Sequence, residues 1–173
     1  HFESAIESIH SLLIEAKGSV GKSSYDRLWQ NIAQAVAGTI LSWLIQGHEQ
    51  DSFNLARAKQ LCCDVTALRR SFQLTSARTS SRGQVSTDAE DGTLPFKALE
   101  DACCLLALPD ESFSSLHDAV MELVGGDDYP SDATMDAHVE SMLAARGTRH
   151  LSPPMAVRVM RLRSVVEIKT GSL

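Results

Sequence analysis

A Gly-Lys-Ser tip is the first stretch whose residue types could do chemistry. Residues 18–24, GSVGKSS, end like a phosphate-binding loop, in which backbone N–H groups surround the phosphates of a nucleotide. Such a loop needs G-x-x-x-x-G-K-[ST] after a buried strand, but Ala16 stands where the first glycine belongs and the preceding residues have a helical period. We therefore expect a turn between two helices, with Gly18 ending the first helix and Ser23 or Ser24 capping the second.

The cysteines and histidines are the next candidates for chemistry. The four cysteines form two adjacent pairs, at 62–63 and 103–104. Zinc sites use spacings such as C-x2-C, whereas neighbours on a helix point about 100° apart, so we expect small apolar fillers in a reducing compartment. His48-Glu49 begins like a zinc-protease motif, but Ser52 stands where the second His is needed. We expect no metal, no cofactor and no catalytic residue, and hence a protein that is not an enzyme.

The charge distribution is uneven along the chain. The 173 residues carry a net charge of −6, yet 110–140 hold nine acidic residues and no Lys or Arg, while 146–169 hold six basic residues and one Glu. A general nucleic-acid-binding protein would show a dominant basic face, so that class is excluded. Two alternatives stay open: the two segments face each other in the fold, or the basic end meets an acidic partner or an anionic membrane.

Apolar residues recur every three or four positions along nearly the whole chain, which predicts an all-α protein. We expect about seven helices in a helical bundle or rod segment, and no sheet. The predicted helices cover residues 2–17, 25–46, 53–72, 95–108, 110–124, 132–146 and 152–163. Residues 1–173 would form a single helical domain, a C-terminal piece of a longer helical-rod protein, with a flexible Ser/Thr-rich loop at 74–93.

The second and the last predicted helices carry the most informative patterns. In helix 25–46 the bulky apolar residues, including Trp29 and Trp43, lie on one stripe that we expect to face the core. In the last helix one face is apolar, and Arg158, Arg161 and Arg163 project elsewhere. We expect these arginines to form a solvated basic ridge, or one that binds an acidic partner helix.

Four stretches, taken in order, resemble one known family. They are LWQNIAQAVAGTILSWLI at 28–45, LARAKQLCCDVTALRRSFQ at 55–73, FKALEDACCLLAL at 96–108 and MLAARGTRHLSPPMAVRVMRLRS at 142–164. The third is similar to an F-K-x-x-E-A-C-x-L-L pattern, with Asp101 where the family usually has Glu. Together they resemble the C-terminal domain of the RINT/TIP-type subunit of the endoplasmic-reticulum vesicle-tethering complex, a member of the helical-rod tethering superfamily.

The resemblance implies a function in Golgi-to-ER retrograde transport. Such a subunit acts with the other subunits of the tethering complex to capture vesicles at the endoplasmic reticulum, and it contacts the ER SNAREs. It is cytoplasmic and peripheral to the ER membrane. The C-terminal domain would be a structural and docking module with no active site to carry over.

Two alternatives come from other functional classes. A helical regulator of a small GTPase would need an exposed arginine that reaches the transition state, and Arg69, Arg70 and Arg78 are the candidates. A peripheral membrane module would use the basic segment 146–169 against anionic lipid. The predictions for Arg158, Arg161 and Arg163 apply to a protein partner as well as to a membrane.

Overall fold

The structure is a computed structural model that describes residues 3–46, 53–76, 94–125 and 132–163. These residues form seven α-helices and one short 3-10 helix, and no strand occurs among them, so the predicted all-α class is confirmed. The elements are α1 (Glu3–Ser19), α2 (Lys22–Gln46), α3 (Leu55–Thr75), η2 (Leu94–Phe96), α4 (Lys97–Leu106), α5 (Asp110–Val124), α6 (Ala133–Ala144) and α7 (Pro153–Arg161). The place of this array in a longer rod stays a prediction.

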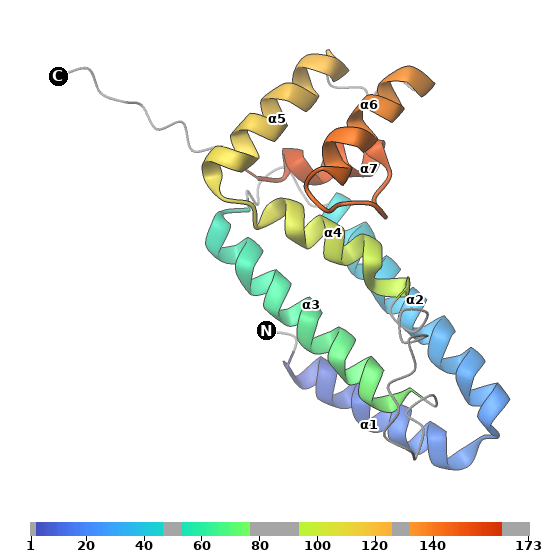
Figure 1. Ribbon diagram of the computed structural model, residues 1–173. Helices are drawn as coiled ribbons and strands as arrows, with labels where there is room; N and C mark the ends of the chain where they lie inside the picture. Colours follow the sequence, from blue (N-terminus) through green and yellow to red (C-terminus); the bar gives the residue numbers. More distant parts are fainter. Residues whose placement is uncertain (1–2, 47–52, 77–93, 126–131, 164–173) are drawn as a thin grey trace.

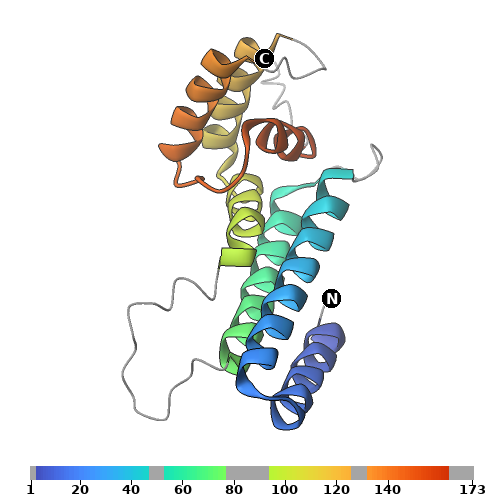
Figure 2. The ribbon, with the colours of Figure 1, turned by 90° about the vertical axis from the view of Figure 1, so that its right-hand side faces the viewer.

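The helices form two groups that α4 joins (Figures 1 and 2). In the longer group α2 and α3 run antiparallel and α1 packs against α3. In the other group α5 and α6 lie side by side, and both contact α7. Because α4 contacts α2 and α3 as well as α7, buried side chains from all seven α-helices belong to one hydrophobic cluster.

The buried face of α2 coincides only in part with the stripe of bulky residues that the sequence predicted, since Trp29 is buried but Trp43 is not. Its buried residues are Tyr25, Trp29, Ala33, Ala37, Leu41 and Leu44. Alanines on a buried face allow neighbouring helices to approach closely, because the distance between helix axes depends on the side chains at the contact. Trp43 is 60% exposed and Leu28 is 38% exposed, so the prediction that Trp43 is a core residue is wrong.

The Gly-Lys-Ser tip lies in a turn between two helices, as predicted, although the helix boundaries differ. α1 continues through Ser19 and α2 begins at Lys22, which leaves a connection too short to surround a phosphate. Gly18 therefore lies inside α1, and Ser23 and Ser24 lie in the first turn of α2 rather than capping it.

Two glycines and one aspartate lie at the ends of helices that correspond to the predicted helices 110–124 and 132–146. Gly125 follows α5 with a φ of 69°, and Gly147 follows α6 with a φ of 83°. These are left-handed conformations in which a Cβ is unfavourable, so glycine suits both positions. Asp132 caps α6, because its carboxylate accepts the N–H of Thr134 at 2.9 Å.

Helix α3 differs from its prediction at both ends. Asn54 caps its start by accepting the N–H of Arg57 at 2.9 Å, so the helix begins at Leu55 rather than at the predicted residue 53. The helix continues to Thr75, so the first residues of the predicted loop 74–93 are helical. Residues 77–93 lie outside the described ranges, and the flexibility predicted for them stays a prediction.

Candidate partner-binding surfaces

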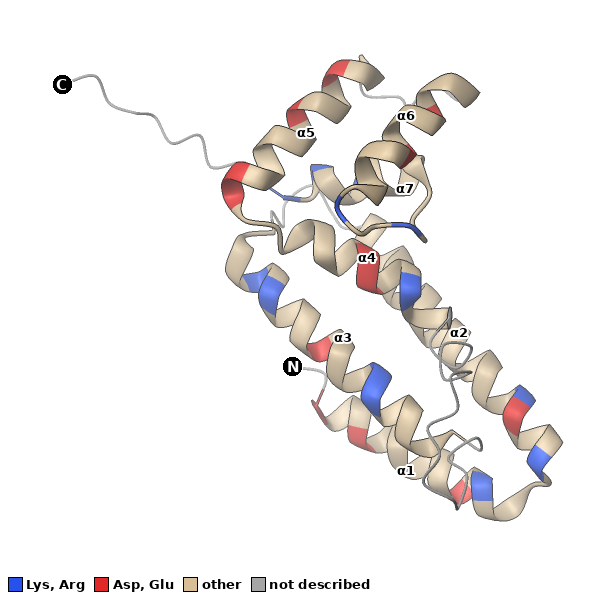
Figure 3. Ribbon diagram, in the orientation of Figure 1, with Lys and Arg blue, Asp and Glu red and all other residues tan. Residues whose placement is uncertain are grey.

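The three arginines of the predicted basic ridge have different environments. Arg158 and Arg161 are exposed on α7, three positions apart and therefore neighbours on the helix surface. Arg163 is only 4% exposed, so the prediction that it projects from the surface is wrong. Figure 3 shows acidic residues along α5 and α6 and basic residues around α7. Arg158 and Arg161 stay candidate partner-binding residues.

Arg163 ties the end of α7 to the connection between α4 and α5. Its guanidinium donates to the backbone oxygens of Leu106, at 3.1 Å, and of Leu108, and it pairs with the carboxylate of Asp110. The same group lies over the ring of Phe113, 4.3 Å from the centroid. The last carbonyls of a helix have no intrahelical donor, and the five N–H groups of arginine can satisfy several of them at once. The side chain thus has a structural role.

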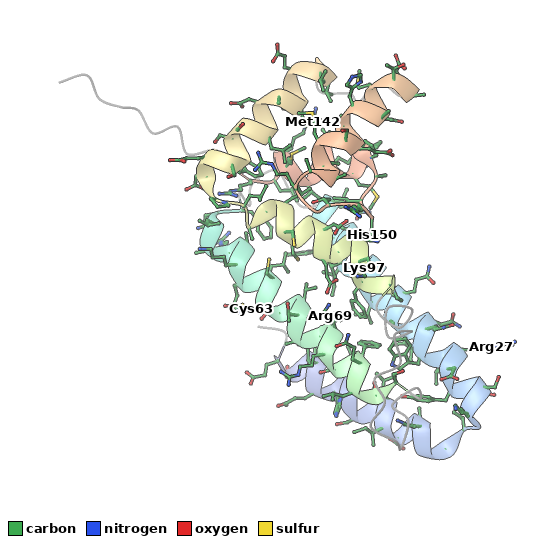
Figure 4. The ribbon with its side chains drawn as sticks, in the orientation of Figure 1. Arg27, Cys63, Arg69, Lys97, Met142 and His150 are labelled. Atoms are coloured by element: carbon green, nitrogen blue, oxygen red, sulfur yellow. The ribbon has the colours of Figure 1, made fainter. Side chains whose placement is uncertain are left out.

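The arginines considered for a GTPase regulator also differ in environment. The Nη1 of Arg69 lies 2.9 Å from Oε1 of Glu100, so this side chain bridges α3 and α4 (Figure 4). Arg70 is exposed on α3, and Arg78 lies outside the described residues. The catalytic arginine of a GTPase activator has to reach into the active site of the GTPase. The ion pair with Glu100 disfavours this role for Arg69.

An apolar groove of about 320 Å³ lies between α1 and α2, and we refer to it as the α1–α2 groove. Its residues are Ala5, Ile6 and Ile9 from α1, Ala35, Val36, Thr39 and Ile40 from α2, and Leu68 from α3. Leu68 is 4% exposed, while Ile6, Ile9, Val36 and Ile40 are half-buried and pack against the core. The groove is therefore open to solvent on one side and closed by the core on the other.

The α2 wall of the groove continues as an exposed apolar stripe. Val36, Ile40 and Trp43 follow one another at spacings of four and three residues and so share one helix face. Glu3 and Glu7 are exposed on α1, although neither lines the groove. No Lys or Arg occurs in the sequence at 3–16 or 28–46, so the fixed side-chain charge on these two segments is negative.

A second hollow of about 420 Å³, lined by both polar and apolar residues, lies where the chain passes from α6 to α7. Asp101 of α4 fixes the backbone that lines this hollow, because one carboxylate oxygen accepts the backbone N–H groups of Arg149, at 2.7 Å, and His150, at 2.6 Å. Nδ1 of His150 lies 3.4 Å from the same oxygen, beside α4 (Figure 4). Glu140 and Arg149 both line the hollow, so its charge is mixed and it favours neither an anion nor a cation.

The four cysteines are all free, and their exposure differs. Cys103 is 3% exposed and fills space in the core, as predicted, and Cys62 is half-buried. Cys63 and Cys104 are exposed, so the prediction that all four are buried fillers is wrong for these two. The two pairs lie on α3 and α4, which pack against each other.

In the ranges that the structure describes, no three His, Cys, Asp or Glu side chains are placed to hold one metal ion. None of the helices in these ranges combines the length and the apolar character that crossing a bilayer requires. The candidate partner-binding surfaces are the α1–α2 groove and the two exposed arginines of α7.

Known proteins give no further guidance. Comparison with protein-family models, curated proteins and solved structures finds no significant match. The resemblance to vesicle-tethering subunits therefore depends on the four ordered sequence stretches, and the function that it implies stays a proposal.

The sequence reasoning missed the α1–α2 groove. The available signal was a second stripe on α2, in which Tyr25, Trp29, Ala33 and Ala37 follow one another at a spacing of four residues. That stripe contains two aromatic residues with polar atoms and two small residues that allow close packing. If the stripe with Tyr25 and Trp29 is taken as the core face of α2, Val36 and Ile40 are expected at the edge of the core.

Proposed function

We propose that this chain is a non-enzymatic protein-interaction domain that binds an amphipathic helix of a partner in the α1–α2 groove. The observation that carries the proposal is the half-buried apolar surface of α2, which lies at the edge of the core and faces a second apolar surface on α1. A groove between two helices with apolar walls is a common binding site for the apolar face of a third helix. Such a helix would present apolar residues at a spacing of three or four positions.

Charge selects among possible partner helices. Glu3 and Glu7 are exposed on α1, and the sequence places no Lys or Arg at 3–16 of α1 or 28–46 of α2. A partner helix with Lys or Arg beside its apolar stripe is attracted electrostatically, whereas an acidic helix is repelled. Trp43, 60% exposed next to the groove, offers a large apolar surface of the kind that often contributes most to binding.

The cellular role follows from the resemblance. The domain belongs, in this proposal, to a cytoplasmic vesicle-tethering subunit at the endoplasmic reticulum that acts in Golgi-to-ER retrograde transport. Its partners are the other subunits of the tethering complex and the ER SNAREs. The ordered stretches at 28–45, 55–73, 96–108 and 142–164 support this role.

The test is co-purification with two matched variants of the full-length protein. Thr39 is an exposed residue of the groove, and Asn31 is exposed on α2 outside it. A lysine at position 39 fills part of the groove and repels a basic helix, so T39K should lose a tether subunit or ER SNARE that wild type and N31K retain, as measured by quantitative mass spectrometry. Equal recovery with T39K and N31K would exclude the groove as the contact. Absence of tether subunits and SNAREs from the wild-type sample would overturn the proposed cellular role.

A further inference from the structure

Two cysteines from different helices meet where α3 packs on α4. The Sγ of Cys62 lies 3.3 Å from the backbone oxygen of Cys103, although the two residues are 41 positions apart in sequence. Cys62 is half-buried, whereas the side chain of Cys103 is buried. The accessible thiol thus lies directly against the residue that carries the inaccessible one.

We propose that Cys62 and Cys103 form a reversible disulfide when the protein meets a peroxide, so that oxidation links α3 to α4 covalently. Cys62 is the residue that peroxide reaches, and Cys103 is the resolving residue. A half-exposed thiol beside a second thiol is the arrangement found at redox-sensing cysteines. The link does not depend on the partner proposed for the α1–α2 groove.

The chemistry balances with hydrogen peroxide as the oxidant. The Cys62 thiolate attacks one peroxide oxygen, the O–O bond breaks, and Cys62 becomes a sulfenic acid while hydroxide leaves and takes up a proton to form water. The Cys103 sulfur then attacks the Cys62 sulfur, the S–O bond breaks, and the oxygen leaves as a second water with the Cys103 proton. Two thiols are oxidised by two electrons, and one peroxide is reduced to two waters.

The environments of the two thiols support this order of events. The neighbouring thiol of Cys103 lowers the pKa of Cys62. The neighbouring thiol of Cys62, together with burial, raises the pKa of Cys103. Cys62 therefore ionises first, and the thiolate is the form that reacts with peroxide.

The other two cysteines provide internal controls. Cys63 lies on the exposed side of α3 (Figure 4), and Cys104 is exposed on α4, where burial of part of its side chain raises the pKa of the thiol. Neither thiol has a hydrogen bond to a cysteine across the α3–α4 contact among the described residues. The double variant C63S/C104S leaves the proposed pair unchanged and removes both alternatives.

The experiment treats the reduced protein with hydrogen peroxide and measures its intact mass and its tryptic peptides without reduction. Wild type and C63S/C104S should each lose two hydrogens, regain them with dithiothreitol, and yield one linked species of peptides 60–69 and 98–146. C62S and C103A should not form it. The proposal is overturned if C63S/C104S stays unlinked, if the cross-link joins two molecules, or if Cys62 is converted to sulfinic acid without a link.

Discussion

The indole Nε1 of Trp29 donates a hydrogen bond of 3.0 Å to the backbone oxygen of Phe72, and the two rings pack edge to face with centroids 5.8 Å apart. The hydroxyl of Tyr25 likewise donates to the backbone oxygen of Thr75 at 2.8 Å. The last carbonyl of α3, that of Thr75, lacks an intrahelical donor and is satisfied by Tyr25 of α2, while the oxygen of Phe72 accepts the N–H of Ser76 as well as the indole of Trp29. The antiparallel pair is therefore held by specific polar contacts as well as by apolar burial.

Replacing Trp29 by phenylalanine should destabilise the protein by about 1–3 kcal/mol, because the buried oxygen of Phe72 loses a donor and the smaller ring leaves space. Urea denaturation monitored by circular dichroism measures the change. Trp43, the other tryptophan of α2, is the matched control. Since Trp43 is 60% exposed, W43F should change the free energy of unfolding by less than about 0.5 kcal/mol. Equal losses for both variants would contradict the assigned burial.

Tyr25 should make stability fall at alkaline pH. Its pKa is raised, chiefly because burial disfavours the phenolate. The unfolded chain therefore releases this proton first, near pH 10, and the folded protein binds more protons between that pH and the raised pKa. Stability contributed by the neutral phenol is present below about pH 10 and is lost as the pH rises above it. In Y25F the decline above that pH should be shallower, as measured by urea denaturation from pH 8 to 11; identical slopes would contradict the raised pKa.

The sequence was sufficient for the helices but not for the choice of face on α2. The 3.6-residue period, Gly125, Gly147 and Asp132 located helices and their ends, because these signals are local. Two apolar stripes compete on α2, and the packing of η2, α4, α1 and α7 against it decides between them. The buried position of Arg163 could not be predicted from the sequence either, because it depends on hydrogen bonds to carbonyls more than 50 residues away in sequence.

Asp101 should order the backbone that enters α7. Replacing it by alanine removes the acceptor of two backbone N–H groups, so we expect a loss of about 1–3 kcal/mol and faster hydrogen exchange at the amides of Arg149 and His150. D101N keeps one acceptor oxygen and should have a smaller effect. The control is E122A, since Glu122 is exposed on α5. Unchanged exchange at both amides in D101A would show that the contact does not order this segment.

Substitution of Arg163 should lower the stability of the protein, whereas substitution of the exposed Arg158 should not. R163A leaves the oxygens of Leu106 and Leu108 without the donor and removes the cation over Phe113, so we expect a loss of about 2–4 kcal/mol in urea denaturation. R163K should recover only part of this, because an ammonium group lacks the planar fork that reaches several acceptors while it stacks on a ring.

R158A is the matched control, since Arg158 is exposed on the same helix. It should change stability by less than about 0.5 kcal/mol. If Arg158 binds an acidic partner, R158E should weaken that binding while the fold stays intact. R163A cannot test partner binding, because it destabilises the fold. A stable R163A together with a destabilised R158A would contradict the structural role of Arg163 and the surface role of Arg158. The buried guanidinium of Arg163 could then not be what attaches α7 to the α4–α5 connection.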